Sequence, residues 1–469
     1  MRIFFITFLY SIIYSQYHSS EWGSITSLLT PTGIQTKDDG TVYASTSGGL
    51  LEFNPYKEEF NFIKMEEGLI YLDLATIAID SLGRIWIGGA YPRGCLQVFD
   101  PEIGLVNFFE DALIESINNI QIGETMAFSA YQGATSSDVG ILKFELDEDG
   151  LPEYQDYYTN FSDGTITEIR DLELFQDGIY VTTDLGVYSG NYKGGSLKNS
   201  QNWMRVSNSD SAKQYLPEVG LIVNNGVIIQ EVDNVEYYNG LNGEVIQANS
   251  EENGKINILT QDWYYELNNS DLTFAFEMPE ISHTKSKFTS FRKIDNTHLY
   301  FGLENSGLLS LNQETGNYHI SIPNTPFRNT YHALTVTQKG YLAAISNIGT
   351  LVWQGITYQN FIPWQHSIYT PDWRDDPDRN KFTWTYLNYL AGEQIPLSIV
   401  EKENGNLIFP NNGIIPDQDQ NLEIPAVIEP PPEFINIFNV GGSISKLFAK
   451  VKLLDSNSPT FLFNSTALS

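Results

Sequence analysis

The sequence contains very little cysteine, and this shortage excludes a fold held by disulfides. Cys95 is the only cysteine among 469 residues, so no intramolecular disulfide can form and stability must come from packing. The surrounding letters GCLQVF contain no base or cation that would lower the pKa of a thiol. We therefore expect Cys95 to be a buried residue of a strand core.

Positive charge is also scarce. Lys and Arg number 26 against 58 Asp and Glu, which gives a formal net charge of -32. Such a surface repels nucleic-acid phosphates and anionic membranes, so nucleic acid is not expected as a partner. We interpret the acidity as a solvated surface, which also suits cations such as calcium or a basic partner protein.

Long apolar runs are absent except at the start of the chain. Residues 3–13 form an apolar run, preceded by Arg2 and followed by the small residue Ser15. This arrangement is typical of a secretory signal peptide, which we place at residues 1–16, although a buried first strand would give the same run. Nothing later approaches the ~20 apolar residues of a transmembrane helix. We expect an exported protein that does not span a membrane.

The short motifs of common active sites are missing as well. The chain has no GxSxG, GxGxxG, Walker A, HExxH or CxxC motif, so acyl hydrolase, nucleotide-binding and common zinc-site functions lack sequence support. The histidines are scattered without ligand spacing, at His18, His283, His298, His319, His332 and His366. We predict no catalytic residue and no cofactor, and therefore a protein that is not an enzyme.

Two acidic segments are candidate calcium ligands, DEDG at 147–150 and WRDDPDR at 373–379. Several carboxylates in each could reach one cation. Neither segment has the twelve-residue spacing of an EF-hand, and Asp beside Gly or Pro is ordinary turn chemistry. We interpret both as turns, with calcium binding as an open alternative.

What the sequence does contain is an internal repeat: a Gly turn, a short β-rich run, a second Gly turn and another apolar run. Clear copies are DDGTVYASTSGGLLEFN at 38–54, SLGRIWIGG at 81–89 and QDGIYVTTDLGVYSG at 176–190. The turn positions recur about every 43 residues, the period of four-stranded propeller blades. These positions are Gly40, Gly83, Gly123, Gly178, Gly226, Gly254, Asn296 and Gly340. The closely spaced Gly226 and Gly254 either share a blade or mark a reduced one.

The strand pattern favours an all-β propeller. RIWIGG, DGIYVTT and THLYFGL are apolar or aromatic on both faces, so they need the cover that stacked blades provide. Gly48–Gly49 and Gly88–Gly89 allow tight turns or close backbone approach near the axis. No long stretch has the 3.6-residue period of a helix. We predict seven blades of four-stranded antiparallel sheets, with eight as the alternative, and very little helix.

These residues carry a resemblance to known propellers. IDSLGRIWIGG with LQVFDP, and the similar GLLEFNP, resemble the repeat of two-component-regulator propellers. WGSITSLLTPTGI near the start and LNYLAGEQIPLSIVEKENGNLIF at 387–409 resemble the N-terminal propeller of PorZ-like proteins of the type IX (Por) secretion system. The likeness covers residues 17 to 415. It implies a place in the periplasm, at the outer membrane or on the cell surface, and a part in cargo export or surface attachment.

Four segments follow from these patterns. After the signal peptide of residues 1–16, we expect a propeller over 17–365 and an irregular last blade, or the start of a further propeller repeat, over 366–428. A Pro-rich link and an uncertain tail occupy 429–469. The fuller members of the PorZ-like family continue into a second propeller and a C-terminal sorting domain, which the sequence does not indicate here. The tail either closes the ring by pairing with the first strand or begins a further domain.

Aromatic residues gather late in the chain, at Trp353, Trp364, Trp373 and Trp384, with Tyr369 among them. Aromatic faces stack on sugars and on peptides, so this group is the candidate contact for a ligand or partner. Packing between blades is the alternative use of the same residues.

We therefore predict an exported binding or scaffold protein of the bacterial envelope. Its expected partner is an envelope protein of a secretion or attachment complex, or a surface polysaccharide. Two alternatives stay open. A propeller lyase or glycoside hydrolase would need carboxylates with Arg or Tyr converging on the central pocket, and a detached two-component sensor ectodomain would need a membrane-anchored partner.

Overall fold

A computed structural model of the protein describes residues 24–161, 164–279, 286–295, 297–326 and 328–336, and after these the strands between 342 and 464. The chain divides into two compact units, one of Met1–Pro279 with Lys285–Ser321 and one of Glu280–Thr284 with Ile322–Ser469. In the described ranges the only helical segment is the short 3-10 helix η2 (Ser200–Asn202), and no helix there is long and apolar enough to cross a membrane.

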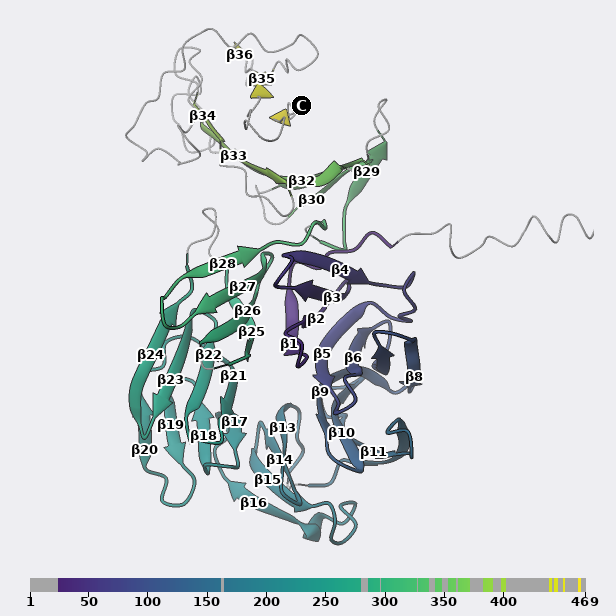
Figure 1. The fold of residues 1–469 in the computed structure, drawn as a ribbon, viewed down its shortest axis with the longest axis vertical. Coiled ribbons are helices and arrows are strands. Elements are labelled where there is room, and N and C mark those ends of the chain that lie inside the picture. Colours follow the sequence, from purple (N-terminus) through teal and green to yellow (C-terminus); the bar gives the residue numbers. More distant parts are fainter. Residues whose placement is uncertain are drawn as a thin grey trace, which may run out of the picture. The chain divides into compact units, whose positions relative to one another are not determined.

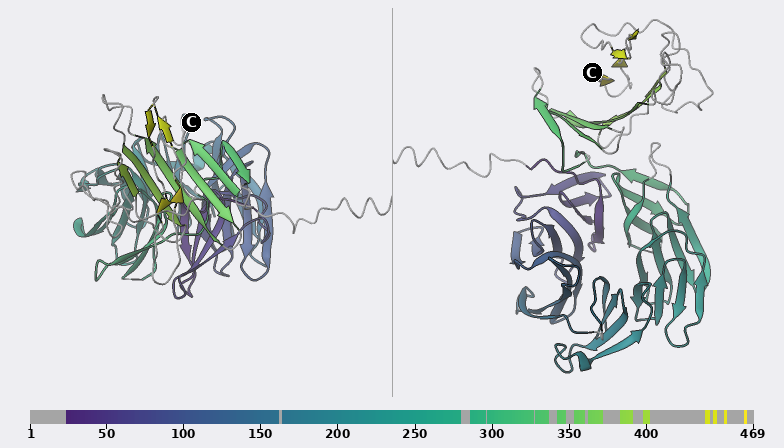
Figure 2. Two further views of the ribbon diagram at one scale, coloured as in Figure 1. Left: turned by 90° about the horizontal axis from the view of Figure 1, so that it is seen from above. Right: turned by 180° about the vertical axis from the view of Figure 1, so that it is seen from behind.

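The first unit consists of seven four-stranded antiparallel sheets, which Figure 1 shows arranged in a ring. Blades 1 to 4 contain β1 (Pro31–Thr36), β2 (Val42–Thr46), β3 (Gly49–Asn54), β4 (Glu59–Ile63); β5 (Asp73–Ile79), β6 (Ile85–Tyr91), β7 (Cys95–Asp100), β8 (Gly104–Glu110); β9 (Ile114–Ile122), β10 (Met126–Gly133), β11 (Val139–Leu146), β12 (Pro152–Tyr158); β13 (Ile169–Phe175), β14 (Gly178–Thr183), β15 (Gly186–Asn191) and β16 (Trp203–Ser207). Blades 5 to 7 contain β17 (Ala212–Leu216), β18 (Leu221–Asn224), β19 (Val227–Gln230), β20 (Glu236–Asn239); β21 (Val245–Ser250), β22 (Ile256–Thr260), β23 (Trp263–Asn268), β24 (Asp271–Glu277); β25 (Phe288–Lys293), β26 (His298–Leu303), β27 (Gly307–Asn312) and β28 (Tyr318–Ser321). The predicted all-β propeller with seven blades is confirmed, and the right view of Figure 2 shows the same ring from behind.

The ring closes between blade 7 and blade 1, where β1 contacts β25 and β26. The N–H of Gly307 donates to the carbonyl of Leu29 (2.7 Å), and the N–H of Asn305 donates to Oγ1 of Thr30 (2.9 Å). Tyr300 of blade 7 packs into the core cluster of blade 1. Each of these two blades is built from consecutive strands, so loop hydrogen bonds and side-chain packing join them.

The strands of a blade are covered on both faces. Ile85, Trp86 and Ile87 stand at successive positions of β6, and all three are fully buried, as the RIWIGG pattern predicts. Cys95 in the neighbouring β7 is also fully buried, which confirms its expected place in a strand core. Burying an aliphatic side chain stabilises a fold by roughly 1.5–3 kcal/mol, so packing between blades stabilises the ring without a disulfide.

Glycine permits the close backbone approach that the sequence predicts. A Cβ atom on Gly88 would lie 2.5 Å from the carbonyl oxygen of Ile117 on the next inner strand. A Cβ atom on Gly48 would overlap the carbonyl oxygen of Ser27. A larger residue at either position would push neighbouring blades or loops apart.

The predicted turn glycines fall mainly between the first and second strands of a blade, as Gly40 and Gly254 do. Gly226 differs, because it lies between β18 and β19, the second and third strands of blade 5. Gly226 and Gly254 therefore belong to consecutive complete blades, and the interpretation that they share a blade or mark a reduced one is wrong. Gly220, between β17 and β18, takes the position that the repeat assigned to Gly226.

The second unit contains one six-stranded antiparallel sheet and two two-stranded sheets among its described strands. These strands are β29 (Ala333–Val336), β30 (Leu342–Asn347), β31 (Trp353–Gln359), β32 (Ile362–Pro371), β33 (Thr383–Leu390), β34 (Ser398–Glu401), β35 (Phe438–Val440), β36 (Ser443–Ser445), β37 (Lys450–Val451) and β38 (Phe463–Asn464). The boundaries predicted at residues 365 and 428 lie within this unit and stay predictions.

Candidate functional site

The innermost strand of every blade carries a bulge near its start. Strands β1, β5, β9, β13, β17, β21 and β25 contact one another in this order, and β25 contacts β1, so together they surround the axis. The bulge residues, each skipped in the pairing with the second strand, are Thr32, Ala75, Asn118, Arg170, Lys213, Ile246 and Thr289. A bulge re-aims the side chains beside it. Side chains are therefore re-aimed at one end of the axis, which we call the entry end because each inner strand begins there.

In blades 4 and 6 the residue after the bulge connects its blade to the next one. Gln247 on β21 accepts the N–H of Phe291 on β25 at 3.0 Å, and Asp171 on β13 accepts the N–H of Tyr215 on β17. Phe291 and Tyr215 occupy matching positions, two residues after the bulges of their strands. The inner edge of a sheet has backbone groups without a strand partner, and in blades 5 and 7 these two polar side chains accept one such N–H group each.

Asp171 is a buried carboxylate among these polar residues of the inner strands, with 4% of its surface exposed. Nδ2 of Asn119 donates to it at 3.2 Å, and the side chain of Gln214 and the backbone N–H groups of Leu172 and Tyr215 donate as well. Burial raises the pKa of Asp171 to about 7, although the four hydrogen bonds favour the ionised form. Its oxygens are enclosed by protein donors, so Asp171 orders the inner strands of blades 3 to 5.

Glu173 lies two residues further along β13 and is half-buried. Burial raises the pKa of Glu173, and the charges of Asp171 and Glu218 raise it further. Asp171 and Glu173 are neighbouring carboxylates whose pKa values are both raised, so the titration of each depends on the charge of the other. Within the described ranges the Glu173 carboxylate makes no hydrogen bond, in contrast to Asp171.

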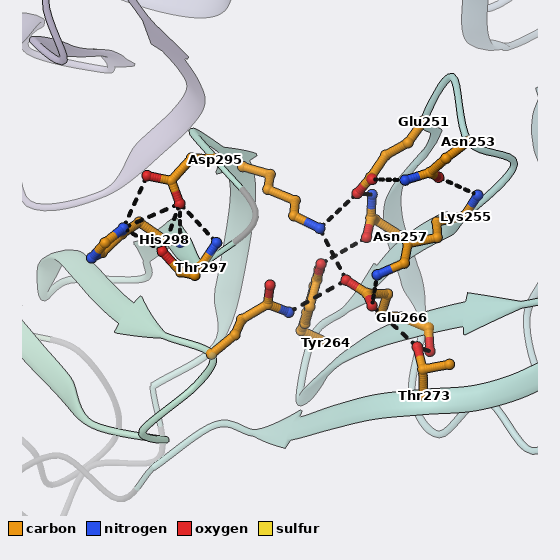
Figure 3. A network of polar contacts seen from close by, with 12 residues as sticks. Glu251, Asn253, Lys255, Asn257, Tyr264, Glu266, Thr273, Asp295, Thr297 and His298 are labelled. Carbon is orange, nitrogen blue, oxygen red and sulfur yellow. Dashed lines mark hydrogen bonds and ion pairs between the residues drawn. The ribbon is translucent and has the colours of Figure 1, made fainter.

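A second polar network lies between blades 6 and 7, at the other end of the inner strands (Figure 3). Nζ of Lys293 on β25 lies 2.7 Å from Oε1 of Glu251 and 3.0 Å from Oε2 of Glu266. Nζ of Lys255 lies 2.8 Å from Oε1 of Glu266. Burial alone would raise the pKa of Glu266, but the two ammonium groups together lower it to about 2. These charges neutralise one another, so the network fastens two blades together.

Amides and hydroxyls complete this network. The hydroxyl of Tyr264 donates to Oδ1 of Asn257 at 2.8 Å, and Nδ2 of Asn257 donates to Oε1 of Glu251 at 3.0 Å. Asp295, in the same view of Figure 3, accepts the backbone N–H groups of Thr297 and His298, and these hydrogen bonds contribute to a lowered pKa of Asp295. The labelled acids of this view, Glu251, Glu266 and Asp295, all have protein donors. Their hydrogen bonds and ion pairs indicate a structural role.

The IDSLGR segment forms a turn that also fastens blades together. The Asp80 carboxylate accepts Nε of Arg84 at 2.8 Å and Nε1 of Trp86 at 3.0 Å. The guanidinium of Arg84 donates to the carbonyls of Asp149 (2.9 Å) and Gly150 (2.7 Å) in the β11–β12 turn of blade 3. The residues that carry the resemblance to propeller repeats thus have a structural role.

The DEDG segment is a turn, as its composition predicts. Oδ1 of Asp147 accepts the N–H groups of Asp149 (2.9 Å) and Leu151 (2.8 Å), and Gly150 has a φ of 71°. In the parts of the chain that the structure describes, no group of three or more His, Cys, Asp or Glu could hold a metal ion. The segment at 373–379 lies outside the described residues.

The predicted aromatic contact residues fall in the second unit. Trp353 on β31 pairs in register with Tyr369 on β32, and Trp384 on β33 pairs with Pro371 on β32. Trp364 also belongs to β32. Trp373 lies outside the described residues. The register brings Trp353 and Tyr369 together, and their role in binding stays a prediction.

The sequence analysis did not identify the carboxylates of Asp171 and Glu173 on the inner strand β13. A charged residue at alternate positions of an otherwise apolar strand, as in IRDLELF around Asp171 and Glu173, is the signal that could have found them. The bulge beside Asp171 hides this signal, because one extra residue breaks the alternation from which a buried face is predicted.

The structure is similar to solved propellers. It matches PorZ of Porphyromonas gingivalis, described as an essential bacterial surface component of the type IX secretion system, with a TM-score of 0.55 at 15% identity over 84% of this chain and 55% of that chain. The extracellular domain of a putative one-component system from B. thetaiotaomicron matches with a TM-score of 0.44 at 12% identity over 79% of this chain and 55% of that chain. A chain of the mitotic checkpoint complex matches with a TM-score of 0.46 at 11% identity over 62% of this chain and 92% of that chain.

No family model matches the sequence, and no curated protein matches it. The chain spans about half the length of the PorZ structure. At 15% identity the likeness concerns the fold. The predicted resemblance to the propeller of PorZ-like proteins is thereby confirmed at the level of the fold, which the chain shares with PorZ.

Proposed function

We propose that the protein is an exported, non-catalytic propeller that binds or scaffolds partners in the bacterial envelope, in association with type IX secretion or surface attachment. The observation that carries the proposal is the likeness to PorZ over 84% of the chain, at a TM-score of 0.55. Both compact units contribute to a match of that extent, since the first unit ends at Ser321. The partner is an envelope protein of a secretion or attachment complex, or a surface polysaccharide.

The use of the buried charges supports a binding role. Glycosidic cleavage needs two carboxylates on either side of a sugar, roughly 5–9.5 Å apart and with oxygens that the substrate can reach. Asp171 accepts four hydrogen bonds from the protein, and Glu266 is paired with Lys255 and Lys293. These acids therefore hold blades together instead of facing a substrate.

The proposed location rests on the N-terminal segment. Arg2 followed by the apolar run of residues 3–13 is the pattern of a signal peptide, and it lies outside the described residues. We place the mature protein in the periplasm, at the outer membrane or on the cell surface.

The test is a pull-down from envelope extract with the chain from Tyr17 onward as bait, followed by mass spectrometry with and without a calcium chelator. An unrelated protein of similar negative charge is the control, because a net charge of -32 attracts basic proteins unspecifically. Enrichment of secretion-system components or surface polysaccharide over the control supports the proposal. Release of reducing ends from polysaccharide by the purified chain would instead favour an enzyme, and enrichment of a membrane-bound kinase would favour a sensor.

A further inference from the structure

Exposed apolar side chains gather on the entry end of blades 1 to 3. Ile25 is 51% exposed, Met65 54%, Ile70 36%, Tyr91 72% and Leu113 73%. They lie in the segment before β1, in the β4–β5 loop, at the last residue of β6 and in the β8–β9 loop, which all reach the end where the inner strands begin. Exposed apolar groups on adjacent loops are typical of interaction sites, whereas isolated ones are common on any surface.

Hydrogen bonds join these loops into one surface, which we call the blade 1–3 rim. Nζ of Lys64, beside Met65, donates to the carbonyl of Ser24 at 3.0 Å, beside Ile25. The hydroxyl of Tyr71, beside Ile70, donates to Oε2 of Glu110 at 2.8 Å. The N–H of Gly94 in the β6–β7 loop, which follows Tyr91, donates to the carbonyl of Ile114, which follows Leu113, at 2.9 Å.

The rim has a surplus of negative charge. Its loops and adjoining strand ends carry six carboxylates and two cations, Glu66, Glu67, Asp73, Glu110, Asp111 and Glu115 against Lys64 and Arg93. Both cations already have acidic neighbours. The ammonium group of Lys64 interacts electrostatically with the carboxylates of Glu66 and Glu67. Nη1 of Arg93 lies 4.0 Å from Oε1 of Glu110. A partner that covers the rim must therefore bring positive charge.

Asp73 and Tyr91 lie opposite each other in the rim. They are register partners on β5 and β6, so their Cα atoms face each other across the strand pair. Asp73 is half-buried, and burial raises its pKa without a cation to oppose the effect. Tyr91 leaves its ring largely in solvent. A carboxylate beside an exposed aromatic face suits a Lys or Arg side chain, which gains an ion pair and a cation–π contact together.

We propose that the blade 1–3 rim binds a basic and apolar segment of a partner protein, with Asp73 and Tyr91 receiving a Lys or Arg side chain. The apolar residues of the segment cover Ile70, Leu113 and Met65. This inference rests on the proposed function only in that both concern binding, and a partner identified by pull-down could equally use another surface.

The test uses the full mature chain and two fluorescent ten-residue peptides, one alternating Lys and Leu and one alternating Glu and Leu. Fluorescence anisotropy measures the Kd at low and at high salt. The Lys peptide should bind, more weakly at high salt, and the Glu peptide should not. Asp73→Asn with Tyr91→Ala should raise the Kd about tenfold, which corresponds to roughly 1.4 kcal/mol.

A matched control removes the same groups from the other end of the ring. Asp38→Asn with Tyr56→Ala also deletes one carboxylate and one exposed ring, in the turns of blade 1. This variant should bind the Lys peptide with unchanged Kd. Equal Kd values for all three proteins would overturn the proposal, because binding would then follow only the net charge of the chain. Unchanged unfolding midpoints ensure that each variant is folded.

A second copy of the chain is the other occupant to test. Light scattering after size-exclusion chromatography measures the mass of the wild type and of Leu113→Asp. A monomeric wild type would support the proposal, because no second copy of the chain would then cover the rim. A dimer that Leu113→Asp converts to monomer would show that the chain covers its own rim, and the proposal of a basic partner would be wrong.

Discussion

Lys293 of blade 7 and Glu266 of blade 6 form an ion pair, with 3.0 Å between Nζ and Oε2, and their side chains are only 11% and 7% exposed. Removing ions from water is costly, so such a pair is stable only when further contacts surround it. Lys293 also contacts Glu251, and Glu266 also contacts Lys255. The four charges therefore belong to one unit, and each depends on the others.

Replacing Lys293 should destabilise the propeller strongly. Lys293→Met leaves Glu266 and Glu251 without their shared cation, and breaking a buried pair in this way costs about 3–5 kcal/mol. Urea denaturation followed by tryptophan fluorescence measures the loss in the free energy of unfolding. Lys193→Met is the matched control, because its pair with Asp177 is more than half exposed and its loss should leave stability unchanged. Equal effects of the two substitutions would contradict the structural role of Lys293.

The stability of the propeller should depend on the titration of Asp171. Its pKa is raised to about 7 in the folded protein from an ordinary value of 3.8, so between these pH values the folded state holds more protons than the unfolded state. The contribution of Asp171 is therefore largest below pH 4 and is lost as the pH rises towards 7, with a slope of at most about 1.4 kcal/mol per pH unit. Asp171→Asn should reduce this slope in urea-unfolding free energies measured between pH 4 and 8, and adding Glu173→Gln should reduce it further, because the pKa of Glu173 is raised as well. A slope that stays the same in both variants would contradict the raised pKa values of this pair.

Much of the propeller could be predicted from the sequence because its repeat is local. The turn around Gly83 and the two-sided apolar strand after it are neighbours in the chain, so short patterns reveal them. The polar network between blades 6 and 7 could not be predicted in this way. Lys293 contacts Glu251 and Glu266 across two blades, and no spacing in the sequence indicates that contact. The repeat failed at Gly226 for a related reason: the first two of the three hairpin turns of blade 5 both contain glycine, and the more conspicuous one is not the repeat position.

The stability of the propeller should require an arginine at position 84, and a lysine should not replace it. The fork of Arg84 reaches Asp80 on one side and the carbonyls of Asp149 and Gly150 on the other, whereas the single ammonium of Lys cannot reach all three. Arg84→Lys should therefore reduce the free energy of unfolding by about 1–3 kcal/mol although the charge is kept. Hydrogen exchange should become faster in the β11–β12 turn, and unchanged protection there would argue against a bridge between blades 2 and 3.

Cys95 provides a test of whether the ring stays closed in solution. The side chain is fully buried, and burial raises the pKa of the thiol to about 12. Because the thiolate is the reactive form, an aromatic disulfide reagent at pH 8 should react roughly a thousandfold more slowly with the folded protein than with the chain unfolded in urea. Similar rates in both states would mean that blade 2 opens readily, which is incompatible with β7 packed inside a closed ring. The thiol thus reports on packing, and Gly88→Ala, which places a Cβ atom against the carbonyl of Ile117, should raise the reaction rate in the folded state by forcing blades 2 and 3 apart.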